Sequence, residues 1–177
     1  MEYNELCKQL ASYSTNVKDL DSRLTKFCQA ATVLMGDAEK LAGVSDKISQ
    51  QSALGRTTDQ APLKDSIASL KEKTDAAKAD TTAMLAELKA IQTRIDERHK
   101  LGAAMATASK KAGTLESKSD PKAGVARQEA DRAEENYNRA HDESLSELKG
   151  WKDSASSRYS SLFDEVELIV QFLFRNN

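Results

Sequence analysis

Three long stretches with a regular spacing of apolar residues constrain the fold of this chain more than any other feature. In residues 3–41, 63–95 and 126–173, apolar or small side chains recur alternately three and four positions apart, with no proline inside any stretch. This spacing aligns the side chains on one face of an α-helix and is typical of helices that pack lengthwise on partner helices. The sequence therefore predicts an all-α fold. The predicted inward positions of the first helix are Tyr3, Leu6, Leu10, Tyr13, Val17, Leu20, Leu24, Phe27, Ala31, Leu34, Ala38, Leu41, Val44 and Ile48.

Two breaks divide the chain into three predicted helices, at about 2–50, 62–117 and 121–175. Residues 51–62 contain Gly, Thr, Asp and Pro without periodicity and predict the first connection. The second break is a sharp reversal. Ser119 is expected to open this turn, Asp120 to cap the third helix, and Pro121 to occupy its first turn, since proline fixes φ near −65° and lacks an N–H.

Antiparallel packing of these helices predicts one elongated three-helix domain over residues 1–177. At 1.5 Å per residue, helices of about 50 residues give a bundle roughly 75–80 Å long. The predicted core thins toward the hairpin, where small residues such as Gly102 and Ala126 occupy the seams. At the other end the seams carry large apolar and aromatic residues.

The bulky end predicts a symmetric homodimer. Residues 162–174 place apolar side chains on more than one helix face, and a slender three-helix bundle cannot cover all of them. Two copies are therefore expected to meet there, with their hairpins pointing outward. The residues predicted to form this interface are Phe27, Leu34, Leu41, Ile67, Leu70, Trp151, Tyr159, Leu162, Val166, Ile169 and Phe172.

The charge around the second break is lopsided. Residues 98–127 contain seven basic and two acidic side chains, a net +5, in a chain of net charge −2. Lys100, Lys111 and Lys118 are separated by eleven and seven residues, which places them within about 20° of one another around a helix. The hairpin is therefore predicted to be a cationic end on an otherwise acidic molecule.

Other signals exclude several classes of protein. No stretch of about 18 apolar residues could span a membrane, and the N-terminus does not resemble a signal peptide. Cys7 and Cys28 are 21 residues apart in one predicted helix, too far for a shared disulfide, and are expected to be reduced thiols in the cytosol. No nucleotide-binding, nucleophile or metal-ligand motif is present, so we expect no enzyme, cofactor or metal site. The acidic balance disfavours nucleic acid as a partner.

The third helix carries a resemblance to a known family. Residues 126–137 (ARQEADRAEENY), the series Leu145, Leu148, Trp151, and residues 158–172 resemble the last helix of BAR domains, including those of sorting nexins. Residues 5–41 resemble the first helix of the same fold.

The resemblance implies a crescent-shaped antiparallel homodimer that docks on anionic, curved membranes and senses or shapes their curvature. A basic concave face and basic tips would make the contact, in a peripheral membrane protein of endocytosis or membrane trafficking with possible protein partners there. The sequence shows no cationic amphipathic segment before the first helix and no phox-type domain, as expected either of a stand-alone domain or of one part of a longer protein. The implied lipid-binding residues are Lys100, Lys110, Lys111, Lys118, Lys122 and Arg127.

Two alternative functions that do not involve membranes remain open. A coiled-coil spacer or cytoskeletal domain similar to spectrin repeats would share the helical composition, although the sequence lacks an internal repeat. A helical protein-docking domain would use an exposed groove instead of a basic hairpin. Binding to anionic liposomes separates both from a membrane-binding module.

Overall fold

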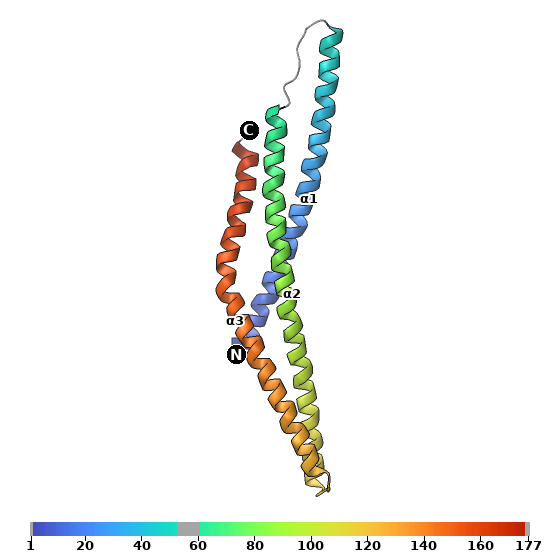
Figure 1. Cartoon of the computed structure of the whole chain (residues 1–177), viewed down its shortest axis with the longest axis vertical. Coiled ribbons are helices and arrows are strands. Elements are labelled where there is room, and N and C mark those ends of the chain that lie inside the picture. The colour runs from blue at the N-terminus through green and yellow to red at the C-terminus, as the bar shows by residue number, and fades with distance from the viewer. Residues whose placement is uncertain (1, 53–60, 176–177) are drawn as a thin grey trace. The chain divides into compact units, whose positions relative to one another are not determined.

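The structure contains three long α-helices and no strand in the part of the chain that it describes (Figure 1). This computed structural model describes residues 2–52 and 61–175, and the side chains of these residues except 61–64, 159 and 172–175. The helices are α1 (Glu2–Gln51), α2 (Ala61–Ser117) and α3 (Ala123–Arg175). The predicted all-α class is thus confirmed, and the helix ends lie within two residues of the predicted ones. The predicted first connection falls mostly outside the described residues.

The sequence supports these long helices because its two prolines lie at helix beginnings. Pro62 is the second residue of α2, and Pro121 lies in the turn just before α3. At these positions the missing proline N–H costs no helical hydrogen bond. Glu2 and Glu5 in the first turn of α1 add a favourable interaction with the positive end of the helix dipole.

The chain divides into two compact units, each built from parts of all three helices. Unit 1 comprises Met1–Ser14 and Ala86–Ser156. The start of α1 packs there against α2 and α3 through the predicted seam positions. Tyr13 of α1 meets Trp151 of α3 edge-on, with ring centroids 5.5 Å apart, so Trp151 is a packing residue within the protomer. The large buried apolar side chains of unit 1 are Tyr3, Leu6, Leu10, Leu88, Ile91, Ile95, Leu148 and Trp151.

Toward the hairpin, unit 1 becomes a two-helix arrangement with an alanine core. Ala112 of α2 packs with Ala126 and Ala130 of α3, flanked by the partly buried Ala108 and Leu115. Small side chains let two helices approach closely, and in Figure 1 the lower parts of α2 and α3 converge on the turn. The predicted thinning of the core toward the hairpin is confirmed.

Unit 2 comprises Thr15–Leu85 and Ser157–Asn177 and has a more mixed core. Thr74 and Thr81 are buried at the predicted seam positions of α2. Their hydroxyls are satisfied, since Thr74 donates to the Leu70 carbonyl at 2.7 Å and Thr81 lies 2.9 Å from Oδ1 of Asp21. A buried hydroxyl with a partner costs little, which explains why threonine is tolerated there. The buried apolar side chains are Val17, Leu24, Ala42, Ile67, Leu70, Ala77, Met84, Leu162 and Ile169.

Beyond Ala31 the predicted seam of α1 is wrong except at Ala38, which is half-buried. From there the inward positions shift by one residue, so that the buried side chains are the small ones of Ala42 and Ser49. The larger apolar side chains on the neighbouring face point outward instead. Apolar spacing identifies a face of a helix, but it does not determine which neighbour that face meets. The predicted inward residues that are exposed in the protomer are Leu34, Leu41, Val44 and Ile48.

Gly102 of α2 faces the ring of Tyr137 on α3. A Cβ at this glycine would lie 3.2 Å from Cε2 of Tyr137, whereas a Cβ at Gly113 of the same helix meets nothing within 4 Å. Tyr137 is held in place by Arg98, whose Nη2 donates to the tyrosine hydroxyl at 2.5 Å. The ring therefore has little freedom to move away from an added methyl group.

We predict opposite outcomes for alanine at these two glycines. Gly113→Ala should raise the free energy of unfolding by about 0.5–1 kcal/mol, because alanine has the higher helix propensity and enough space there. Gly102→Ala should not be stabilised in this way, because the close contact between the added methyl group and the Tyr137 ring offsets the higher helix propensity. Urea unfolding of both variants followed by circular dichroism measures the difference, and equal stabilisation of the two would contradict the described packing.

Glu165 of α3 is a half-buried carboxylate of unit 2. Its Oε2 atom is buried and has no hydrogen-bond partner in the described part of the chain. Burial raises the pKa of this carboxyl, and the nearby Asp80 carboxylate raises it further. The side chain borders a cavity of about 320 Å³. The cavity is lined by Ser69, Glu72, Lys73, Ala76, Glu165 and Leu168.

We predict that Glu165→Gln stabilises the protein at pH 7, by up to about 1 kcal/mol, because the amide removes a charge that folding disfavours. A carboxyl whose pKa is higher in the folded state binds its proton more readily there, so wild-type stability rises as the pH falls toward the ordinary value of 4.5. The advantage of the variant should therefore shrink over that range. Thermal unfolding at several pH values tests this, with the exposed Glu167→Gln as control.

Candidate functional site

The turn between α2 and α3 has a defined backbone structure. Ser119 adopts a left-handed conformation, with φ of 50°. Its N–H donates to the Glu116 carbonyl at 3.0 Å, and the N–H of Asp120 donates to the Leu115 carbonyl, also at 3.0 Å. These two bonds form a Schellman motif, in which glycine usually occupies the position of Ser119. The motif ends α2 sharply and fixes the direction in which the chain returns.

Asp120 caps the start of α3, as the sequence predicts. Its Oδ1 accepts a hydrogen bond from the backbone N–H of Lys122 at 2.8 Å, and its carbonyl accepts one from the N–H of Ala123 at 2.9 Å. A carboxylate at a helix N-terminus satisfies a free N–H and interacts favourably with the helix dipole. The negative charge of Asp120 is therefore directed at the backbone.

Two of the six predicted lipid-binding residues form ion pairs within the hairpin. Nζ of Lys111 lies 2.8 Å from Oε2 of Glu129, and Nε of Arg127 lies 3.1 Å from Oδ1 of Asp131. The Lys111 hydrogen bond lowers the pKa of the Glu129 carboxyl, with a smaller contribution from the Lys111 charge. Such exposed pairs are weak, but they offset part of the positive charge.

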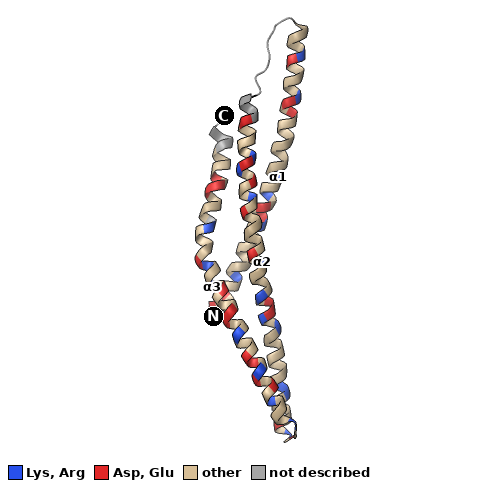
Figure 2. Cartoon of the chain, in the orientation of Figure 1, with Lys and Arg blue, Asp and Glu red and all other residues tan. Residues whose placement is uncertain are grey.

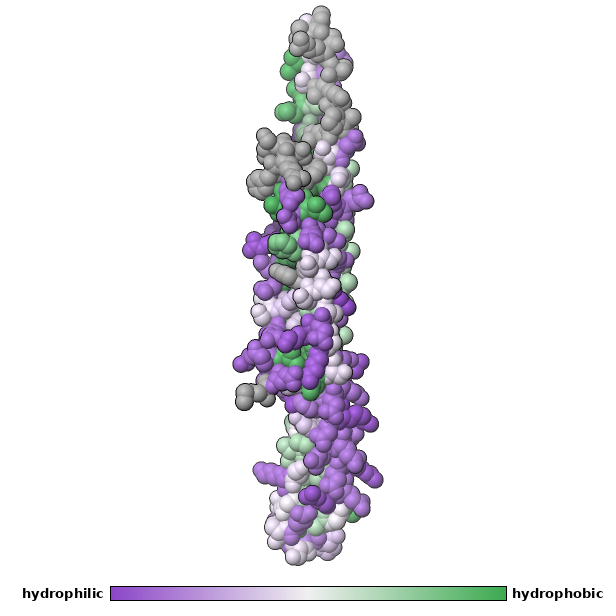
Figure 3. Space-filling view, turned by 90° about the vertical axis from the view of Figure 1, so that its left-hand side faces the viewer, coloured by the Kyte–Doolittle hydropathy of each residue, from purple (hydrophilic) through white to green (hydrophobic). Residues whose placement is uncertain are grey.

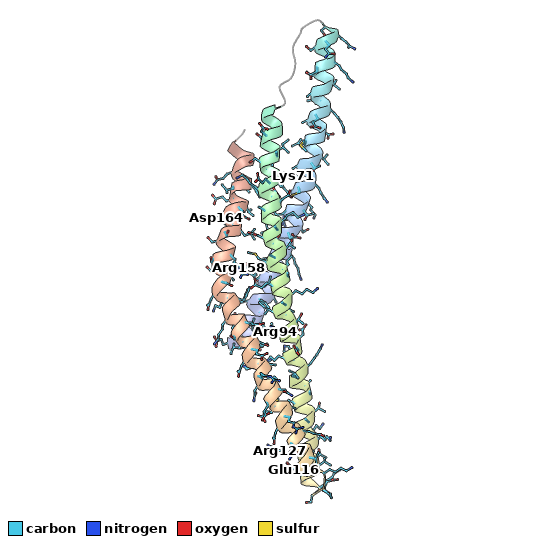
Figure 4. The ribbon with its side chains drawn as sticks, viewed as in Figure 1. Lys71, Arg94, Glu116, Arg127, Arg158 and Asp164 are labelled. Carbon is cyan, nitrogen blue, oxygen red and sulfur yellow. The ribbon has the colours of Figure 1, made fainter. Side chains whose placement is uncertain are left out.

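The other four predicted lipid-binding residues are exposed and form no ion pair with described residues. We call them the hairpin lysines. Figure 2 shows basic residues in blue along the lower parts of α2 and α3, and Figure 4 places Glu116 and Arg127 close to the turn. When the count is extended to residue 131 to include the two paired acids, seven basic side chains oppose four acidic ones, a net +3. The hairpin lysines are Lys100, Lys110, Lys118 and Lys122.

Arg98, which contributes to the positive charge counted above, is not a freely exposed cation. It is half-buried, with its Cζ 4.2 Å from the ring centroid of Tyr3 and 5.1 Å from that of Tyr137, and its Nε donates to Nδ1 of His141 at 3.0 Å. Arg98 therefore ties the first turn of α1 to α3 inside unit 1 through cation–π and hydrogen-bond contacts. Sequence reasoning missed this cluster. The available signal was that Arg98, Tyr3 and Tyr137 all occupy seam positions.

Outside the hairpin, the described residues include two half-buried thiols and a cavity lined by side chains of both charges. No group of three or more His, Cys, Asp or Glu side chains is positioned to hold a metal ion in that part of the chain. Burial raises the pKa of the Cys7 and Cys28 thiols, which makes both poorer nucleophiles. A cavity of about 160 Å³ between α2 and α3 combines side chains of both charges. Its lining residues are Arg94, Glu97, Leu101, Asn136, Arg139, Ala140, Glu143 and Ser144.

The predicted interface residues fall into four groups in the structure. Leu34 and Leu41 are 66% and 77% exposed, and Phe27 and Val166 are half-buried. The side chains of Tyr159 and Phe172 lie outside the described residues. The remaining residues pack inside the protomer, so their role in contacting a second copy stays a prediction. These are Ile67, Leu70, Trp151, Leu162 and Ile169.

Unit 2 exposes an apolar stripe on α1 that the predicted interface only partly includes. We define the α1 stripe as Leu34, Leu41, Val44 and Ile48, which share one helix face and are all at least 56% exposed. In Figure 3 green, hydrophobic side chains lie at the surface near the upper end, where Figure 1 shows the end of α1. The exposed apolar side chains of α3 in this unit are Phe163, Leu168 and Val170.

No protein-family profile matches this chain, and no curated protein matches its sequence. In the described residues, no helix has a stretch that is both long and apolar enough to cross a bilayer.

Proposed function

We propose that this chain is a non-catalytic module that docks on anionic membranes through the hairpin between α2 and α3. The observation that carries the proposal is the set of four exposed hairpin lysines without ion-pair partners among the described residues. Each basic residue near an anionic leaflet contributes about 1 kcal/mol, so the three nearest the turn, Lys110, Lys118 and Lys122, supply about 3 kcal/mol per copy. Lys100 lies further along α2 and adds to this where the membrane also follows the side of the hairpin. This is enough for reversible docking when two copies bind together.

The α1 stripe supports a homodimer as the functional form. Its four large apolar side chains are costly to leave in water, and a face exposed on one copy is exposed on every copy. A twofold axis brings two identical stripes together without requiring any other partner. We propose that the protomer is an elongated three-helix bundle and that its dimer is crescent-shaped, like the BAR domains that the sequence resembles.

A stiff dimer with basic tips and a basic concave face would bind best to a membrane whose curvature matches the curvature of the dimer. Such a module senses or shapes curvature at a cytoplasmic membrane surface, in keeping with a role in trafficking. The acidic segment 131–147 on α3 offers a separate surface for a basic protein partner. The competing spacer and protein-docking functions would use the exposed apolar side chains of unit 2 and would not require the hairpin lysines.

We predict that Lys110→Gln/Lys118→Gln/Lys122→Gln weakens binding to vesicles that contain phosphatidylserine by roughly 100-fold, since three charges contribute about 3 kcal/mol. The matched control is Lys18→Gln/Lys26→Gln/Lys47→Gln, which removes three exposed lysines of unit 2. Cosedimentation with the vesicles at low and high salt measures the binding of both variants. Salt should weaken the wild type and the control much more than the hairpin variant.

Two results would turn the interpretation toward a spacer or protein-docking domain. One is wild-type binding that does not depend on the anionic lipid content of the vesicles. The other is an equal loss of binding in the hairpin variant and the control, because a diffuse charge effect does not need a hairpin site.

We also predict that Leu41→Glu converts the protein from dimer to monomer without loss of helix. A buried carboxylate in the middle of a twofold contact is repeated on both copies, so the cost counts twice. Sedimentation equilibrium and circular dichroism measure the two properties, and Gln50→Glu adds the same charge at an exposed position away from the stripe. A wild-type protein that is monomeric at high concentration would exclude this assembly.

A further inference from the structure

Unit 1 has one large apolar side chain that is strongly exposed among its described residues, and this side chain lies at the hairpin. Val125 is 61% exposed. The other strongly exposed large apolar residues of the described chain all belong to unit 2. A single exposed valine is ordinary on a protein surface. Its position beside the turn and its neighbours give Val125 a specific role.

The geometry of α3 directs Val125 toward the turn. Val125 is the third residue of the helix, and Cα–Cβ bonds in a helix tilt toward its N-terminus, which here is the turn itself. The inward face of this part of α3 is occupied by Ala126 and Ala130. Val125 therefore lies on the outer side of the hairpin, where the alanine core cannot cover it.

The charged neighbours of Val125 along the chain are Lys122, three residues before it, and Glu129, four residues after it, and Glu129 is paired with Lys111. Lys122 and Val125 therefore lie on neighbouring positions of the same side, and the two residues between them add no charge or bulk. Asp120, the nearest acid in the turn, accepts a hydrogen bond from the backbone N–H of Lys122. An apolar side chain beside an exposed lysine matches an anionic bilayer, which offers phosphates at the surface and hydrocarbon below.

We propose that Val125 inserts into the boundary between headgroups and acyl chains while Lys118 and Lys122 contact the anionic headgroups. This inference rests on the proposed membrane-docking function and assigns part of the contact to an apolar side chain. A soluble polyanion presents phosphates without a hydrocarbon layer. Val125 therefore distinguishes a membrane from a soluble phosphate ligand, whereas the lysines interact with both.

The test compares two probes on the same variants. Val125→Ser should weaken binding to vesicles of phosphatidylserine and phosphatidylcholine by roughly threefold to tenfold. The same variant should bind the soluble polyanion inositol hexakisphosphate as the wild type does. Val33→Ser is the matched control, since Val33 is a 63% exposed valine of unit 2. Because Val33 lies on the same side of the helix as Val44 of the α1 stripe, sedimentation equilibrium first establishes that this variant keeps the wild-type oligomeric state, and its vesicle binding should then be unchanged.

A fluorescent variant reports the insertion directly. Val125→Trp should gain emission that shifts to the blue on vesicles and is quenched by lipids brominated on their acyl chains. The native Trp151 is buried in unit 1 and gives a constant background. Val33→Trp should show neither the shift nor the quenching.

The outcomes separate this inference from the function on which it rests. Unchanged vesicle binding by Val125→Ser, together with loss of binding in the hairpin lysine variant, overturns insertion and leaves electrostatic docking. Loss of binding to both vesicles and inositol hexakisphosphate also overturns insertion, because it indicates an altered hairpin. A hairpin lysine variant that binds vesicles like the wild type overturns the proposed function itself.

Discussion

Lengthwise burial of a narrow apolar seam is the interaction on which the rest of this structure depends. Both cysteines are free, and among the described residues few polar contacts between helices reach the core, the Thr81 to Asp21 hydrogen bond being one. Stability therefore comes mainly from side chains that meet along the helices, one layer after another. Helical phase then decides the side of the molecule on which every charged residue lies, so the core also determines the charge pattern of the surface.

The alanine core of the hairpin links packing to the proposed binding surface. Because Ala112, Ala126 and Ala130 let α2 and α3 approach closely, side chains at their edges can reach across, as Lys111 does to Glu129. Only the lysines that point away from the partner helix remain available. The turn contributes in a similar way, since Ser119 accepts an unfavourable left-handed backbone conformation and thereby closes the Schellman motif. The available positive charge is thus a consequence of how tightly the hairpin is built.

The two sides of α1 in unit 2 have different roles. Its inward positions beyond Ala31 are small, as at Ala42, whereas its large apolar residues face outward. This distribution is unfavourable for an isolated protomer and favourable for an assembly that covers the α1 stripe. In the proposed membrane docking each lysine contributes little, so a twofold assembly would also add the contacts of a second hairpin.

The sequence alone determined the all-α class, the helix ends to within two residues, and the Asp120 cap, because helical period and capping are local properties of the chain. It also determined the seam of α3 and that of α2 as far as Met105, whereas the predicted Ser109 is exposed and Ala112 is buried instead. It also located the basic hairpin. Only the tertiary structure decided which cations are paired, that Arg98 is enclosed by Tyr3 and Tyr137, and that the large residues of α1 beyond Ala31 face outward. The helical repeat of apolar residues specifies which residues share a face of a helix. The neighbour that this face meets depends on the distances between helices, and no local pattern in the sequence contains these distances.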